Sequence, residues 1–231
     1  MRRHGSSRTS GSRPDRAGAE ATGGEVEDRL RAAVAAERRE LADLLAALPA
    51  ERWDAPTLCA GWRVREVVAH LTMPFRTSLG RLALDVVRAR GSFNRAANFA
   101  ARRDAAALPP QRLVAALRDN AEHPWTPVGG GVVGALSHDV IHGLDITVAL
   151  GLDRRVPAER LTAVLTGMRP RNARFFGTDL AGVRLRATDL EWEYGSGTPL
   201  HGLAQNLLLV ICGRRLPAGH LCGKPAPRFT G

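Results

Sequence analysis

A pair of histidines gives this sequence its clearest chemical signal. His138 and His142 lie four residues apart, and Asp145 follows three residues later. In a helix this spacing places all three side chains on one face. Two imidazoles one turn apart can bind one divalent metal ion, although each can also be a separately hydrogen-bonded histidine of the interior. A third ligand elsewhere in the chain would favour the metal.

The segment that carries the pair, residues 135–150, is predicted to be one helix. Apolar residues recur every four positions from Leu136 to Val148, which is the stripe expected of a helix. Gly151 follows, and glycine readily adopts the left-handed conformation just past a helix end. We therefore expect the histidines on one face of this helix and an apolar stripe on another.

His70 is the candidate third ligand. It lies in a second predicted helix, which begins near Arg63 and has an apolar stripe beside the histidine. Because Pro74 has no N–H for the carbonyl of His70, we expect the backbone to open or kink there. Irregular backbone next to an inward-pointing histidine suits a site, whereas His70 taken alone also fits a satisfied core histidine.

Helical bundles build sites from inward-facing side chains on different helices. His70, His138 and His142 would supply three nitrogens and leave positions open for water or substrate, which is the pattern of catalytic metal sites. Zinc is the expected ion because imidazole suits it, with Ni, Fe, Co or Mn as alternatives.

Composition favours a helical protein with one large domain, or with one medium and one small domain. The 231 residues are 44% hydrophobic, only 5% aromatic and rich in Ala and Leu. No apolar run approaches the ~18 residues of a membrane helix, and no signal peptide is visible, so we interpret the chain as cytoplasmic and not membrane-bound. Cys59, Cys212 and Cys222 show no close metal-ligand spacing and fit a reducing compartment without disulfides.

The net charge of +10 comes almost entirely from arginine, since Lys224 is the only lysine. A basic chain raises the possibility of a nucleic-acid partner. The arginines are scattered, however, and no aromatic residues are interleaved with a basic cluster. We therefore expect a solvated arginine-rich surface and no nucleic-acid partner.

Apolar periodicity predicts a helical bundle over residues 25–178, preceded by a disordered basic tail over residues 1–24. The predicted helices cover residues 25–48, 63–90 (in one or more pieces), 94–104, 109–122 and 135–150, with a further helix that starts at Pro157 and ends before Gly177. A loop over residues 50–61 precedes the helix of His70.

The pattern changes at Gly182. Residues 183–188 and 190–194 alternate apolar and polar side chains, which predicts two strands of a hairpin. A loop over 195–199, a very apolar helix over 200–212 and one edge strand near the end should follow. Residues 179–231 are thus expected to form a small α+β unit.

Three motifs in this order resemble one known family. They are Thr57-Leu-Cys-Ala-Gly-Trp62 followed by Val67-Val-Ala-His-Leu71, the run from His138 to Asp145, and Ala187-Thr-Asp-Leu-Glu-Trp192 followed by Cys212-Gly-Arg214. Together they resemble the mycothiol-dependent maleylpyruvate isomerase family of the DinB/YfiT-like metalloenzyme superfamily, over about residues 25–225. The resemblance implies a mainly α fold, in which a DinB-like four-helix up-and-down bundle is followed by a small sterol-carrier-like α+β unit.

The resemblance also implies metal ligands at His70, His138 and His142, with mycothiol as co-substrate. A metal-held thiol is a thiolate at neutral pH and can attack a small electrophile. Asp145 would orient a ligand imidazole, or make a polar contact between helices. Arg214 would anchor a carboxylate of the substrate or thiol, or cap the carbonyls of its own helix.

This sequence departs from the family pattern at two positions. The isomerase itself resembles Glu-x-x-x-His on the second ligand helix, whereas His138 here matches the three-histidine pattern of DinB-like relatives. A metal ion held by three neutral histidines should be a stronger Lewis acid than one held by a site with a carboxylate. The isomerase's own reaction is therefore not assigned to this chain. Arg63 also stands where relatives carry a capping Ser or Thr, so Glu66 should lose its capping partner at a cost of about 1 kcal/mol.

The other candidate residues are assigned structural roles. We expect Asp139 to face solvent, Cys59 to be a buried thiol, and Trp62 and Trp192 to lie in the core. The preferred function is a thiol-using isomerase or transferase. The alternatives are a hydrolase that activates water at the same histidines, and a non-catalytic small-ligand-binding protein. A monomer or homodimer is expected.

Overall fold

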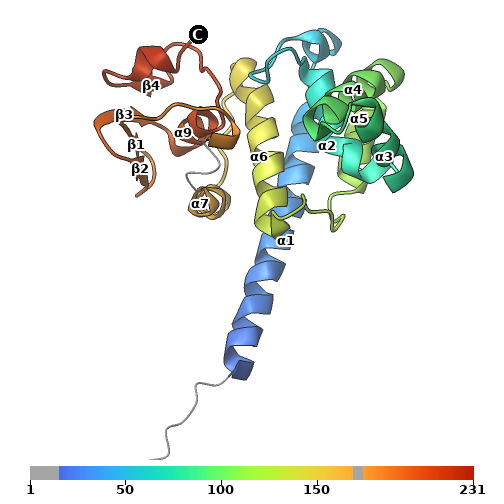
Figure 1. Ribbon diagram of the computed structural model, residues 1–231, viewed down its shortest axis with the longest axis horizontal. Helices are drawn as coiled ribbons and strands as arrows, with labels where there is room; N and C mark the ends of the chain where they lie inside the picture. The colour runs from blue at the N-terminus through green and yellow to red at the C-terminus, as the bar shows by residue number, and fades with distance from the viewer. Residues whose placement is uncertain (1–15, 169–173) are drawn as a thin grey trace, which may run out of the picture.

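The computed structural model describes residues 16–168 and 174–231 and contains a helical part followed by a small sheet (Figure 1). The helical elements are α1 (Arg16–Ala46), η1 (Ala50–Asp54), α2 (Val64–Arg76), α3 (Leu79–Arg88), α4 (Phe93–Ala107), α5 (Pro110–Asp119), α6 (Gly131–Ala149), α7 (Ala158–Gly167), α9 (Ala204–Ile211) and η2 (Ala226–Arg228). The strands are β1 (Val183–Ala187), β2 (Glu193–Gly195), β3 (Thr198–Gly202) and β4 (Leu221–Cys222). This confirms the predicted class, a mainly helical protein with a small α+β unit.

Helix α6 is the central element. It packs against α1 and α2 on one side and against α7 and α9 on the other, as Figure 1 shows. Ile146 belongs to the apolar cluster shared with α1, α2 and α5, whereas Leu136 and Leu144 belong to the cluster shared with α7, α9 and the sheet. Because α6 is covered on both sides, it is apolar nearly all round.

The helix boundaries follow local signals in several places. The helix predicted over residues 135–150 is confirmed as α6, and Gly151 adopts the expected left-handed conformation with φ +66°. α5 begins at Pro110, and Pro157 precedes the first residue of α7, as proline's fixed φ favours at helix starts. α7 ends at Gly167, before Gly177 as predicted, and residues 169–173 between them lie outside the described part.

The start of the first helix differs from the prediction. α1 begins at Arg16 rather than at residue 25, so residues 16–24 of the predicted tail are helical, while residues 1–15 lie outside the described part. The stretch from Arg16 to Thr22 contains three alanines and one glutamate, and both residue types are strong helix formers. That local propensity outweighs the absence of an apolar stripe.

The C-terminal unit is a four-stranded sheet in the order β2-β1-β3-β4. β1 pairs antiparallel with β2, as the predicted hairpin requires, and parallel with β3. β4 lies at an edge, antiparallel to β3, which confirms the expected edge strand.

The prediction of a loop over 195–199 and a helix from residue 200 was wrong. Residues Thr198–Gly202 form β3, in which Leu200 lies opposite Leu185 of β1 with both side chains fully buried. The helix begins only at Ala204, whose N–H donates to the carboxylate of Asp189 at 2.7 Å. This cap comes from a distant loop, so local sequence could not reveal it.

The start of α2 also corrects an expectation. Glu66 keeps a partner, because its carboxylate accepts hydrogen bonds from the backbone N–H of Arg63 at 2.8 Å and from the Arg63 guanidinium at 2.6 Å. Arginine cannot accept a bond as Ser or Thr would, but its charge stabilises Glu66 instead. The predicted loss of the partner of Glu66 was therefore wrong.

Within residues 16–168 and 174–231, no helix is both long and apolar enough to span a membrane.

Replacing Glu66 by Gln should lower the free energy of unfolding by about 1 kcal/mol at neutral pH, the usual effect of losing a helix cap. Burial alone would raise the pKa of Glu66, but the hydrogen bonds and charge of Arg63 lower it below its usual value. The carboxylate's contribution is therefore complete above the pKa of the unfolded chain, and it is lost as the pH falls through the folded-state pKa. Urea unfolding at neutral pH and in acid measures this, and an equal difference between the two proteins under both conditions would contradict it.

Candidate metal centre

The structure brings the three histidines together from two helices. His70 comes from α2, and His138 and His142 come from α6. The Nε2 atoms of His70 and His138 are 3.2 Å apart. One ligand nitrogen from each of the three rings lies within 4.8 Å of the others. These three side chains are called the histidine cluster below.

Two tryptophans flank the histidine cluster. The ring of Trp62 lies 5.1 Å from that of His70, and the ring of Trp125 lies 5.2 Å from that of His138. Trp62 is only half-buried, and its Nε1–H donates to Asn98 at 2.7 Å. Trp62 packs against the core as the sequence suggested, but it is only partly buried and also lies against the histidine cluster.

His142 is held by a buried carboxylate that an arginine neutralises. Its Nδ1 lies 3.0 Å from Asp145. Arg214 donates to both oxygens of Asp145 at 2.8 Å, and a further N–H bonds the Cys212 carbonyl at the end of α9 at 2.7 Å. Asp145 therefore makes both contacts that the sequence analysis considered, one to an imidazole and one to a neighbouring element. Arg214 caps its own helix as the sequence allowed, and its pairing with Asp145 is an addition that sequence spacing could not indicate.

Asp139 corrects a prediction, because it is buried rather than solvent-facing. It is 1% exposed. Its Oδ1 lies 2.9 Å from Nδ1 of His138, and its Oδ2 accepts a hydrogen bond from Nε of Arg38 at 2.7 Å. The prediction assumed a solvated face of α6, but neighbours cover this helix on both sides. Sequence analysis also missed Arg38, although its position four residues after Val34 and three before Leu41 places it on the apolar stripe of α1.

These contacts indicate which nitrogen of His138 and of His142 carries a proton. A carboxylate only accepts hydrogen bonds, so His138 and His142 carry their protons on Nδ1 and turn the Nε2 lone pairs toward the cluster. His70 has no such partner among the described residues, since its buried Nδ1 makes no hydrogen bond.

Two rings of the histidine cluster, those of His70 and His142, favour the neutral form. Burial lowers the pKa of His70 well below its usual value, and the neighbouring His142 and His138 lower it further. Burial also lowers the pKa of His142, although the hydrogen bond that its ring donates to Asp145 opposes this. Burial would raise the pKa of Asp145, yet Arg214 and His142 hold it below its usual value. Neutral imidazole is the form that binds a metal ion.

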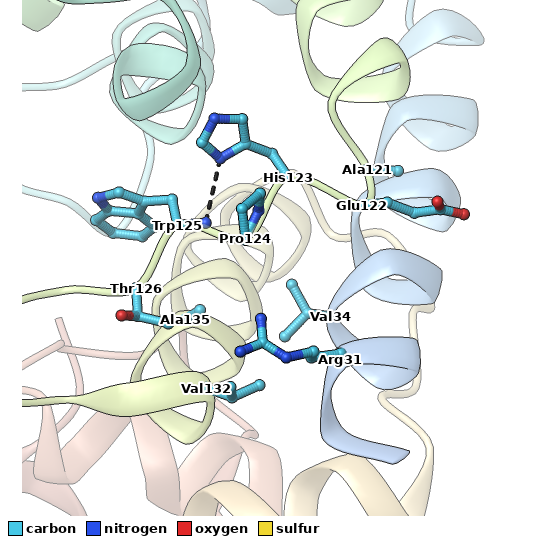
Figure 2. Close-up of a pocket in the computed structure, with 10 residues that line it drawn as sticks. All are labelled: Arg31, Val34, Ala121, Glu122, His123, Pro124, Trp125, Thr126, Val132 and Ala135. Carbon is cyan, nitrogen blue, oxygen red and sulfur yellow. Dashed lines mark hydrogen bonds between the residues drawn. The ribbon is translucent and has the colours of Figure 1, made fainter. Parts of the chain in front are cut away.

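A small cavity lies between α1, the segment of residues 121–126 and the start of α6, and Trp125 is one of the residues that line it (Figure 2). Its volume is about 40 Å³, which is room for water but not for a substrate. In this cavity the backbone N–H of Trp125 donates to Nδ1 of His123 at 3.1 Å, the dashed line of Figure 2. His123 is therefore a satisfied structural residue, and the cavity is not a substrate pocket.

Replacing Arg214 by Met should lower the free energy of unfolding by about 3–5 kcal/mol, because it leaves the fully buried carboxylate of Asp145 without its charge partner. Arg215 is the matched control, since it is exposed and donates only to backbone carbonyls. Arg215→Met should change stability by less than about 0.5 kcal/mol. Denaturant unfolding of both variants measures this, and equal losses would show that the Asp145 pair is not special.

The three cysteines should differ sharply in reactivity. All three are free. Burial, helped by the charge of Asp145, raises the pKa of Cys59 to about 11, and burial raises the pKa of Cys212 to about 12. Since the thiolate is the nucleophile, iodoacetamide at neutral pH should label exposed Cys222 and spare Cys59 and Cys212. Peptide mass spectrometry of native protein reads this out, with urea-unfolded protein as the control. Fast labelling of native Cys59 would contradict it.

Comparison with known proteins supports the sequence resemblance. Residues 34–124 match the family model of the mycothiol maleylpyruvate isomerase N-terminal domain. No curated protein sequence matches the chain significantly. Two crystal structures of the mycothiol-dependent maleylpyruvate isomerase, one of them of a histidine-to-alanine mutant, are each 12% identical, with a TM-score of 0.49 over 86% of this chain and 93% of theirs. The matched segment, residues 34–124, is similar to this N-terminal domain and includes His70, whereas His138 and His142 lie outside it.

Proposed function

We propose that this protein is a metal-dependent enzyme that uses a low-molecular-weight thiol, mycothiol, to isomerise or transfer a group on a small electrophilic substrate. The observation that carries the proposal is the convergence of three imidazoles, two of which are locked with Nε2 facing the others. The family of residues 34–124 supports the thiol, because its name specifies mycothiol.

The donor set of the histidine cluster fits a divalent metal ion, with zinc as our first choice. Two ring nitrogens 3.2 Å apart, on His70 and His138, need a proton or a cation between them. Three protein nitrogens leave coordination positions free, as in catalytic zinc sites. A bound ion of this kind would lower the pKa of a coordinated thiol, so that the thiolate exists at neutral pH.

The protein's own residues set the electrostatics of the site. An imidazole nitrogen brings no negative charge to a metal ion, and each nearby carboxylate is paired with an arginine, Asp139 with Arg38 and Asp145 with Arg214. The surroundings therefore add little net negative charge that would repel an anionic thiolate or substrate.

Arg214 holds the ring of His142 through Asp145 and contributes from the C-terminal unit. Three of its nitrogens already donate to the Asp145 carboxylate and the Cys212 carbonyl. We therefore assign Arg214 and Asp145 to holding the site in shape. Trp62 and Trp125 limit the access of water to the rings of His70 and His138.

Metal analysis of the purified protein beside a His142→Ala variant tests the proposal. We expect about one zinc ion per chain in the wild type, and loss of that ion in the variant, because removing one of three nitrogens leaves too few protein ligands. His201→Ala is the matched control, since His201 lies in β3, outside the cluster.

A thiol-dependence assay of the metal-loaded protein then separates the candidate functions. Turnover of small electrophiles only with added mycothiol, or with a simple thiol in its place, is expected. Turnover without any thiol would instead assign a water-activating hydrolase. Absence of metal from the wild type, even after incubation with Zn, Ni, Fe, Co or Mn, would reject the enzyme and leave a ligand-binding protein.

A further inference from the structure

Arg38 occupies an unusual position for an arginine, since its side chain is completely buried in the middle of α1. Nε donates to Asp139 at 2.7 Å, and Nη1 donates to the carbonyls of Ala121 at 3.2 Å and His123 at 2.9 Å. The guanidinium also lies 4.8 Å above the ring of Phe75. One side chain thus joins α1, α2 and the segment after α5 to α6.

Stability alone is a poor explanation for this pair. Removing two charges from water costs as much as their attraction returns, and apolar residues of similar volume often replace a buried ion pair without loss of stability. Here the guanidinium also leaves Nη2 buried without a partner among the described residues, which is an added cost. What the pair contributes specifically is the second oxygen of Asp139, which faces His138.

The same arrangement occurs twice around α6. His142 hydrogen-bonds to Asp145, which also accepts hydrogen bonds from Arg214. In the same way, His138 hydrogen-bonds to Asp139, which also accepts a hydrogen bond from Arg38. The two arginines approach α6 from different elements, since Arg38 belongs to α1 and Arg214 follows α9. The rings of His138 and His142 are therefore each held by a carboxylate that an arginine from another element fixes. His70 on α2 has no such partner among the described residues.

We infer that Arg38 and Asp139 are positioning residues of the histidine cluster. Asp139 fixes the proton of His138 on Nδ1 and aims Nε2 at His70, and Arg38 keeps the carboxylate of Asp139 in place. Only the zinc-affinity part of this inference rests on the proposed function. The ring proton of His138 has a defined position with or without a metal. It concerns residues that the family resemblance does not assign.

The test replaces the pair by apolar residues in the double variant R38M/D139L, which leaves no unpaired buried charge. The matched control is E37L/R154M. Glu37 precedes Arg38 in α1 and is equally buried. It pairs with Arg154 and Arg160, whereas Arg38 pairs with Asp139, the hydrogen-bond partner of His138. Both double variants remove a buried ion pair anchored on α1, and only the first reaches the histidine cluster.

Two readouts are needed. In metal-free protein, ¹⁵N–¹H correlation spectra of the imidazoles should show His138 protonated on Nδ1 in the wild type and the control, and this signal should be lost in R38M/D139L. In chelator competition, the zinc affinity of R38M/D139L should fall about 10–100-fold, the usual effect of losing a ligand's hydrogen-bond partner. The control should bind zinc as the wild type does.

The outcomes separate the two proposals. If R38M/D139L keeps both the Nδ1 proton and the zinc affinity of the control, the inference is overturned while the proposed function stands. If the wild type binds no zinc, the proposed function fails, and the imidazole spectra alone decide the inference. Equal losses of zinc affinity in both double variants would reduce the pair to a structural role and also overturn the inference.

Discussion

The absence of a solvated face along most of α6 is the constraint on which the site depends. With the helical bundle on one side and the C-terminal unit on the other, a polar side chain on this helix must find its partner inside the protein. Asp139 and Asp145 are both almost fully buried, and each is matched by an arginine that arrives from another element. Asp139 keeps its second oxygen for His138, whereas Asp145 shares one oxygen between Arg214 and His142. Burial of these two carboxylates thus dictates how the rings of His138 and His142 are oriented, and the proposed metal binding depends on that orientation.

The sequence predicted the parts of this arrangement that are written in local spacing. The four-residue interval between His138 and His142, the stop at Gly151 and the helix starts at the prolines all follow from helix geometry and proline's fixed backbone angle. The motif at residues 57–71 lies within residues 34–124, which match the family model of the N-terminal domain. The family resemblance placed His70 beside the other two histidines, which spacing alone could only suggest.

What the sequence did not predict depends on contacts between distant segments. Asp139 was assigned to solvent because a periodic pattern marks the apolar face of α6 but not how many neighbours cover it. The strand from Thr198 to Gly202 forms because β1 offers a parallel partner, and pairing of this kind overrides local propensity. The partners of Asp139 and Asp145 lie 101 and 69 residues away, a separation at which no periodicity carries information.

The position of Arg214 after α9 has a consequence for how the chain acquires its structure during synthesis. Asp145 leaves the ribosome 69 residues before the arginine that balances it. Until that arginine has been made, the native position of α6 would bury the carboxylate of Asp145 without its charge partner, which is strongly destabilising. The native packing of α6 therefore depends on a side chain from a late part of the chain.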